Sequence, residues 1–161
     1  MSKYNDAMKI MDERFGNGKD NGLCLATIGY DPNADGKPRP SVRNVDGYYE
    51  DSAFYVVTYT ESKKMQQIDT NPDVAIAVNF EWLSANGIGE NLGWVRDEKN
   101  AEMMKKVRAA FFKWYDNGDV NEEDPKTCLL RIRLTDGVIT DHERTYGEFR
   151  YYVDFVNKTV Q

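Results

Sequence analysis

Short segments rich in β-branched and aromatic residues, separated by turn dipeptides, constrain this sequence most strongly. Such residues suit a half-buried, pleated strand, and Asp-Gly pairs are typical of tight turns. In 127–134, leucine and isoleucine alternate with arginine, which indicates one face turned inward. We therefore expect antiparallel strands at 23–30, 40–45, 53–59, 73–80, 87–95, 127–134 and 149–156, with turns at Asp35-Gly36, Asp46-Gly47 and Asp136-Gly137.

Three helices are expected between these strands. The first is amphipathic and ends at Gly16, which we expect to adopt a left-handed conformation. The second is short, with Ser62 as its N-cap, and ends at Asn71-Pro72. A longer third helix starts at Asp97 and ends at Asn117-Gly118; its apolar stripe consists of Met104, Val107, Phe111 and Trp114. The acidic run at 121–124 is expected to be a solvated loop. Together the pattern indicates an antiparallel barrel or sandwich with added helices.

Length and charge narrow the classes of function. The 161 residues predict a single domain, 1–161. The net charge of -6 has the wrong sign for a protein that binds the phosphate backbone of nucleic acid through a basic face. No apolar run approaches the ~20 residues of a membrane helix, and the N-terminus lacks the apolar segment of a signal peptide. We expect a cytoplasmic protein that binds neither nucleic acid nor membrane.

Cysteine and histidine are too scarce for several kinds of site. Cys24 and Cys128 lie far apart in sequence, without the spacing of a metal site. His142 is the single histidine. A protein zinc site or a Ser-His-Asp triad would depend on that one imidazole, so we expect no metal and no triad. No catalytic residue can be named from the sequence.

One basic cluster stands out in this acidic chain. Ser62, Lys63 and Lys64 begin the short second helix, Thr58 precedes them near the end of a strand, and Arg43 lies on the strand before. The first turn of a helix offers free N–H groups and a partial positive charge, so it attracts anions. Two ammonium groups, a hydroxyl and a guanidinium would suit a phosphomonoester. On spacing alone, a solvated helix face with a serine cap remains the alternative.

The same segment resembles a known family. The order Arg43-Asn44-Val45, a strand ending in Thr58, Ser62-Lys63-Lys64, Gln67 and Asn71-Pro72 is similar to that of the pyridoxamine 5'-phosphate oxidase-like family, over roughly residues 20 to 115. The resemblance implies a split antiparallel β-barrel, mainly β with helices, that binds FMN as a homodimer with the flavin at the subunit interface. It assigns Arg43, Lys63 and Lys64 to the phosphate, and Asn44, Val45, Val57 and Thr58 to the ribityl chain and ring. Ser62 and Gln67 are further expected contacts.

The sequence also departs from the oxidase of that family. Tyr48 stands where the oxidase has a lysine for the substrate phosphate, and the C-terminus lacks its Arg-x-His pair. We therefore do not expect oxidation of pyridoxamine phosphate. A flavin-dependent oxidoreductase that uses NAD(P)H or a small molecule is the interpretation, with a non-catalytic flavin or haem module, or a reductase of the deazaflavin F420, as alternatives. Trp82 could flank a ring or plug the barrel, and His142 is expected to be exposed.

Overall fold

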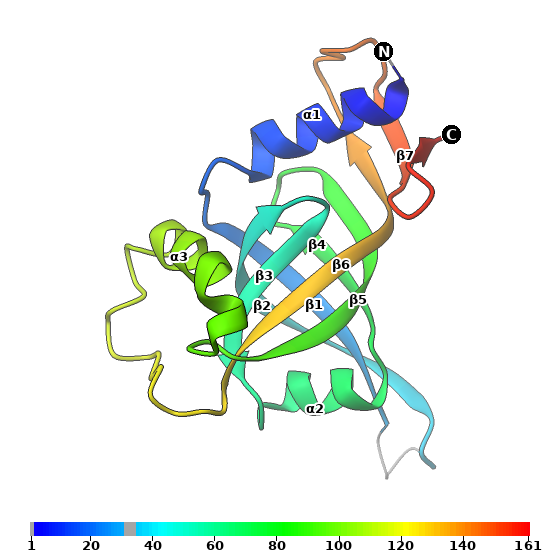
Figure 1. Cartoon of the computed structure of the whole chain (residues 1–161). Helices are drawn as coiled ribbons and strands as arrows, with labels where there is room; N and C mark the ends of the chain where they lie inside the picture. Colours follow the sequence, from blue (N-terminus) through cyan, green and yellow to red (C-terminus); the bar gives the residue numbers. More distant parts are fainter. Residues whose placement is uncertain (1, 31–34) are drawn as a thin grey trace.

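The strands form one antiparallel sheet that closes on itself. The computed structural model describes residues 2–30 and 35–161. In this part of the chain eight strands follow the order β3-β2-β1-β4-β5-β6-β7-β8, and β3 also pairs with β6. The additional pairing closes β1 to β6 into a barrel (Figure 1), which confirms the expected split antiparallel β-barrel with helices. The strands are β1 (Asn21–Tyr30), β2 (Pro38–Glu50), β3 (Ala53–Tyr59), β4 (Asp73–Val78), β5 (Leu83–Trp94), β6 (Thr127–Thr140), β7 (Arg150–Asp154) and β8 (Thr159–Val160).

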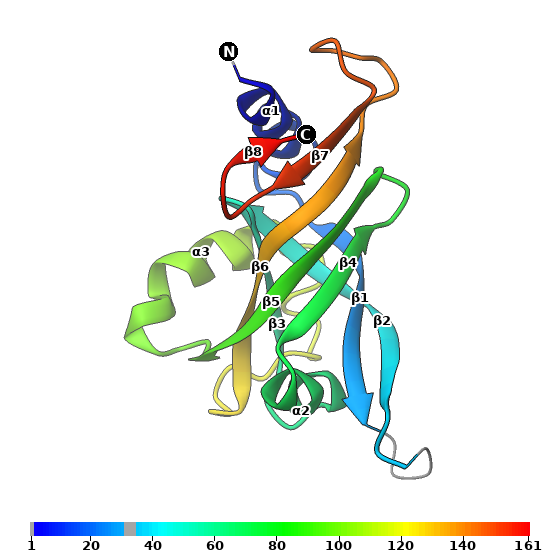
Figure 2. The same cartoon turned by 90° about the vertical axis from the view of Figure 1, so that its right-hand side faces the viewer.

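The helices cover different parts of the barrel. Helix α1 (Lys3–Phe15) lies across one end, and α2 (Lys63–Thr70) lies at the opposite end (Figures 1 and 2). Helix α3 (Ala101–Ala110), preceded by the 3-10 helix η2 (Glu98–Asn100), packs beside β2 and β3. None of the helices in the described ranges combines the length and the apolar character needed to cross a bilayer.

The barrel is split between β2 and β3. In the described chain these strands pair only where Tyr48–Glu50 meets Ala53–Tyr55. Beyond these positions β2 pairs with β1 alone, out to Pro38, whereas β3 continues along β6 to Tyr59. The two strands therefore diverge towards the end of the barrel that carries α2. We use "the split" for the region between 38–47 of β2 and 56–59 of β3, where these two strands do not pair with each other.

The structure contains two apolar clusters, one inside the barrel and one between the outside of the barrel and α3. Strand residues that point into the barrel, such as Leu25, Phe54 and Ile132, are fully buried. They belong to the same cluster as the buried residues of α1 and α2. Outward-facing residues of β2, β3 and β6 form a second cluster with α3, in which Met104 and Val107 are buried as the helical stripe predicts. The alternation along β6 is likewise confirmed: Leu130, Ile132 and Leu134 are buried.

Two of the predicted turns are wrong. Asp46-Gly47 lies within β2, and the chain reverses instead at Asp51 and Ser52, which have φ values of 48° and 60°. Asp136-Gly137 lies within β6, where a register shift opposite Asn86 and Gly87 places a bulge instead of a reversal. The turn at Asp35-Gly36 does follow the first strand, but the preceding residues 31–34 of that connection lie outside the described residues.

Helix ends also differ from expectation. Gly16 has φ -83°, so it is not left-handed; Asn17 and Gly18, at 59° and 73°, adopt that conformation one and two residues later. Asp97 caps η2 by accepting from the Lys99 N–H. The regular third helix then ends at Ala110, and Trp114 lies in the turns that follow.

Candidate functional site

Arg43 lies on the inward side of β2, at the edge of the split. Its neighbour across the sheet is Leu25, whose carbonyl accepts from Arg43 Nη1 at 3.2 Å. The same nitrogen donates to Thr27 Oγ1 at 2.7 Å, and Nη2 donates to Gln67 Oε1 at 3.1 Å. These contacts come from β1 and from α2. The guanidinium is therefore fixed between the barrel wall and the helix.

Lys64 brings a second cation to the same place. Its Nζ donates to Thr58 Oγ1, on the β3 side of the split, at 2.9 Å. Burial lowers the pKa of Lys64, and the positive charge of Arg43 lowers it further. Burial also lowers the pKa of Arg43. The two cations are thus close together and partly removed from water.

Within the described residues, no acidic side chain forms an ion pair with either of these two cations. Among the ion pairs of residues 2–30 and 35–161, none includes Arg43, Lys63 or Lys64. In a chain with net charge -6, an uncompensated, half-buried pair of cations is unusual. The charge is available for an anionic ligand.

The beginning of α2 adds further donors. Ser62 is the N-cap, and its Oγ accepts from the Met65 N–H at 3.4 Å. The N–H groups of Lys63 and Lys64 have no partner within the helix, because the first turn of any α-helix leaves such groups free. The Lys63 side chain is exposed. We call Arg43, Thr58, Ser62, Lys63, Lys64 and Gln67 the cradle.

Three other predicted site residues lie on β2 and β3 beside the split, but outside the cradle. Val45 packs against the inner core. Val57 points to the other side of the wall, where it packs in the α3 cluster. Asn44 is exposed on the outer face, and its Oδ1 accepts from Cys24 Sγ at 3.4 Å. Successive residues of a strand point to opposite faces of the sheet. The predicted residues therefore lie on both strands of the split, β2 and β3, and point both into the barrel and away from it.

Two residues of the site were missed from sequence. Thr27 is 1% exposed, accepts from Arg43 and donates to Gln67 Oε1. Ser41 stands opposite Thr27 in the sheet, and its Oγ accepts from Gln67 Nε2 at 3.4 Å. The alternation of β1 contained a signal for Thr27, since a hydroxyl on the same face as Leu23 and Leu25 needs a polar partner.

The donor set fits a phosphate monoester. Such a group carries close to two negative charges and accepts several hydrogen bonds, and the cradle provides three cationic side chains, hydroxyls and free helix N–H groups. The position that would hold the substrate phosphate in the oxidase differs, because Tyr48 is 8% exposed and its hydroxyl donates to Glu50 Oε1 at 3.1 Å. The fold is a split β-barrel, and the cradle is a candidate anion site at its α2 end.

Comparison with known proteins gives the family. Residues 18–140 match the model of the pyridoxamine 5'-phosphate oxidase family, and the chain belongs to it. A search of curated proteins finds no match.

Solved structures share the fold at low sequence identity. A pyridoxamine 5'-phosphate oxidase-related, FMN-binding protein from Nostoc punctiforme is 19% identical and has a TM-score of 0.53, over 100% of this chain and 95% of that one. An F420 reductase is 19% identical with a TM-score of 0.54, over 78% and 94% of the two chains. A haem-binding protein from Mycobacterium smegmatis is 13% identical with a TM-score of 0.59, over 92% of this chain and 59% of that one.

Proposed function

We propose that this protein binds FMN in the split, with the flavin phosphate in the cradle. The observation that carries this proposal is the pair of half-buried cations, Arg43 and Lys64, held beside the N-terminus of α2 without an acidic partner among the described residues. A phosphate that entered the cradle would neutralise both charges and raise the pKa of Lys64 towards its ordinary value. The family membership supports the same ligand.

Each residue then has a stated part in binding. Arg43, Ser62, Lys63 and Lys64 hold the phosphate, and Gln67 orients Arg43. Asn44, Val45, Val57 and Thr58 line the ribityl chain and ring, where the unpaired backbone groups of β2 and β3 provide hydrogen bonds. A bound flavin supplies hydride transfer, so the protein has only to bind, orient and exclude water.

We further propose that the activity is that of an oxidoreductase. The reductant would be NAD(P)H or a small molecule, and pyridoxamine phosphate is a poor candidate because Tyr48 cannot anchor its phosphate. Two-fold homodimers with the flavin at the subunit interface complete the proposal. Both cysteines are free, which supports a reducing, cytoplasmic environment.

The absorbance spectrum of the purified protein separates this proposal from its alternatives. We expect flavin absorption that bleaches when NADH or NADPH is added. A yellow protein that does not bleach would indicate a binding module, uptake of F420 but not FMN would indicate the deazaflavin, and a Soret band would indicate haem. His142 is exposed beside Trp82, and its neighbour Asp141 pairs with Arg14 of α1. Because α1 and α2 lie at opposite ends of the barrel, this disfavours His142 as a haem ligand at the cradle.

Replacement of Lys63 and Lys64 together by alanine tests the cradle. We expect FMN binding to weaken by about 2 to 4 kcal/mol, at about 1 to 2 kcal/mol for each charge-assisted contact. The measurement is a calorimetric titration with FMN. Lys99 and Lys105, replaced together by alanine, remove the same charge near α3, where both side chains are exposed, and serve as the matched control. Unchanged FMN affinity in the Lys63/Lys64 variant would refute the assignment.

A further inference from the structure

Helix α1 covers the end of the barrel opposite the cradle (Figure 1). Its inner residues, such as Ile10 and Phe15, are buried in the inner core. Trp82 lies near the same end, because Thr140 donates to the Trp82 carbonyl and accepts from Arg14 of α1. The Trp82 side chain is 59% exposed, however, and does not plug the barrel. The helix is therefore the element that closes this end.

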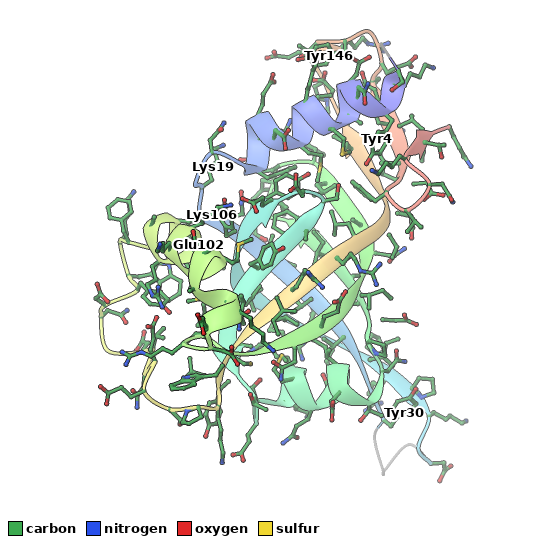
Figure 3. All side chains as sticks on the ribbon, viewed as in Figure 1. Tyr4, Lys19, Tyr30, Glu102, Lys106 and Tyr146 are labelled. Atoms are coloured by element: carbon green, nitrogen blue, oxygen red, sulfur yellow. The ribbon has the colours of Figure 1, made fainter. Side chains whose placement is uncertain are left out.

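A cavity of about 440 Å³ lies beneath α1. Tyr4, Met8 and Asp12 face it, since residues four apart lie on one side of a helix. The other walls come from the β2–β3 turn, β6 and the β7–β8 turn. Figure 3 shows Tyr4 below α1, on the side of the barrel. The volume is in the ordinary range of small-molecule sites, and no residue of the cradle lines this cavity.

Charged side chains of both signs line the cavity. Asp12 of α1 lies near Asp51 of the β2–β3 turn; burial raises the pKa of Asp12, and the charge of Asp51 raises it further. Lys158 comes from the β7–β8 turn. Within the described chain, none of these three residues belongs to an ion pair, whereas Arg133, the other cation of the lining, is already paired with Glu90 at 2.8 Å. Two carboxylates and one ammonium group are therefore left to interact with a ligand.

Tyr49 adds a buried hydroxyl to the lining. The residue is 3% exposed, and its Oη accepts from the Ser52 N–H at 3.3 Å. Burial raises the pKa of Tyr49 to about 12, so the hydroxyl keeps its proton at neutral pH. No group in the described part of the chain accepts that proton. Because buried donors normally have acceptors, this hydroxyl indicates an acceptor on a bound molecule.

The remaining wall of the cavity is apolar. Leu134 and Phe155 are both buried and contribute part of their surface to it, together with the half-buried Met8. Such a surface suits a hydrocarbon or aromatic group. The cavity thus combines acids for an ammonium group, donors for a carboxylate and a place for an apolar side chain.

We propose that this cavity binds a free amino acid with a large apolar side chain. The ammonium group of the ligand interacts with Asp12 and Asp51, its carboxylate accepts from Lys158 and from the Tyr49 hydroxyl, and its side chain packs against Phe155. A simple amine would leave the Tyr49 proton without an acceptor, and a simple carboxylate would meet two acids. This second site goes beyond the proposed flavin function and does not depend on it.

Three related molecules test the chemistry of the cavity. Phenylalanine has both charged groups, phenethylamine lacks the carboxylate, and phenylpropanoate lacks the ammonium group. Calorimetric titration of the full-length wild-type protein with each gives three dissociation constants. We expect phenylalanine to bind at least about tenfold more tightly than either analogue, because only phenylalanine satisfies both sets of charges.

Two variants assign the ends of the ligand. Asp51 and Lys158 have φ values of 48° and 58°, and asparagine accepts this conformation, so Asp51→Asn and Lys158→Asn keep the fold. Asp51→Asn should weaken phenylalanine and phenethylamine about tenfold without weakening phenylpropanoate; Lys158→Asn should weaken phenylalanine and phenylpropanoate about tenfold without weakening phenethylamine. Asp116→Asn, on an exposed turn outside the cavity, is the control and leaves all three affinities unchanged.

Three results would overturn the inference. They are absence of binding of phenylalanine, leucine and methionine at millimolar concentration, equal affinity of the wild type for phenylalanine and phenethylamine, and wild-type affinity for phenylalanine in both variants. FMN titration of the same variants separates the two sites, since neither residue belongs to the cradle and FMN affinity should stay unchanged. Loss of FMN binding by the wild type would refute the proposed function and leave this inference intact.

Discussion

Single side chains in this protein determine where charge is tolerated. The Arg43 guanidinium donates to Thr27 and to Gln67, and Thr27 in turn donates to Gln67. Because both partners are uncharged, these hydrogen bonds hold the cation in the split without neutralising it. An acid at either position would form an internal ion pair and compete with an anionic ligand. A hydroxyl and an amide at these positions hold Arg43 in place and leave its charge without a counter-ion from either residue.

Asp46 shows the opposite situation, a carboxyl group that resists ionisation. Burial, followed by the hydrogen bond to Asp20 and the charge of Asp20, raises the pKa of Asp46 to about 6. Trp114 Nε1 donates to Asp20 Oδ2 at 2.7 Å, which links the pair to the segment after α3. The folded protein therefore holds a proton here more tightly than the unfolded chain does.

The sign of the resulting pH dependence follows. The stabilisation from the shared proton is complete below the unfolded pKa of about 4 and disappears as the pH rises through about 6. In the wild type, we expect this group to make the free energy of unfolding about 1 kcal/mol larger at pH 4 than at pH 7, a figure discounted for partial exposure. Asp46→Asn should remove that difference. Urea unfolding at pH 4, 5 and 7 measures it, with Asp116→Asn on an exposed turn as control. An equally steep profile in Asp46→Asn would contradict the assignment.

At the scale of elements, Glu122 fastens the acidic loop to α3. The expectation of a solvated loop at 121–124 is wrong at this position, because the Glu122 side chain is 14% exposed. Its carboxylate accepts from Arg108 Nε at 2.8 Å and from the Tyr115 hydroxyl. Burial alone would raise the pKa of Glu122, but the hydrogen bonds from Arg108 and Tyr115 lower it overall. The sequence alone could not reveal a partner fourteen residues away.

Glu122→Gln should therefore destabilise the fold. We expect a loss of about 1.5 to 3 kcal/mol, since hydrogen bonds to a charged group are lost while Arg108 and Tyr115 stay in place. Chemical unfolding at pH 7 measures the change. Glu123→Gln, next along the chain and exposed, should stay within about 0.5 kcal/mol of wild type. Equal effects of the two substitutions would show that Glu122 is an ordinary surface residue.

Gly47 explains why one predicted turn is a strand. A Cβ at this position would lie 2.6 Å from Leu23 Cδ1 and 3.3 Å from Phe54 Cδ1, so glycine is present for close packing and not for a turn. We expect Gly47→Ala to cost about 1 to 3 kcal/mol from overpacking. In Gly22→Ala the new Cβ would meet only the flexible Asn79 side chain, at 3.1 Å, and the loss of melting temperature should be smaller. A larger loss in Gly22→Ala would contradict this account.

The errors and successes of sequence reasoning have a common physical basis. Local signals were sufficient where the cause is local: Ser62 caps α2 as predicted, Asn71 ends it, and the alternation of β6 is confirmed. They were insufficient where the cause is tertiary. An Asp-Gly pair has the same local preference in a turn and in a strand, and only contacts such as Leu23 against Gly47 decide between them. The alternation of β1 does place the Thr27 hydroxyl on the buried face, but its partners Arg43 and Gln67 come from other elements and could not be identified locally.

For the whole molecule, the split connects the fold to the proposed chemistry. Pairing of β2 with β3 over only three positions leaves two strand edges open, and α2 places its N-terminus at the end of that opening. A ring with polar edges fits open strand edges, and a phosphate fits the helix N-terminus. The proposed cofactor would therefore match the fold in two places, its ring at the open strand edges and its phosphate at the helix N-terminus.

The most direct test of this account compares FMN with riboflavin, which lacks the phosphate. Calorimetric titration of the wild-type protein and of the Arg43→Gln and Lys64→Gln double variant gives four dissociation constants. We predict that the wild type binds FMN at least about a hundredfold more tightly than riboflavin, and that this preference falls to about tenfold or less in the variant while riboflavin affinity changes little. Equal affinity of the wild type for FMN and riboflavin, or an undiminished preference in the variant, would contradict the central claim.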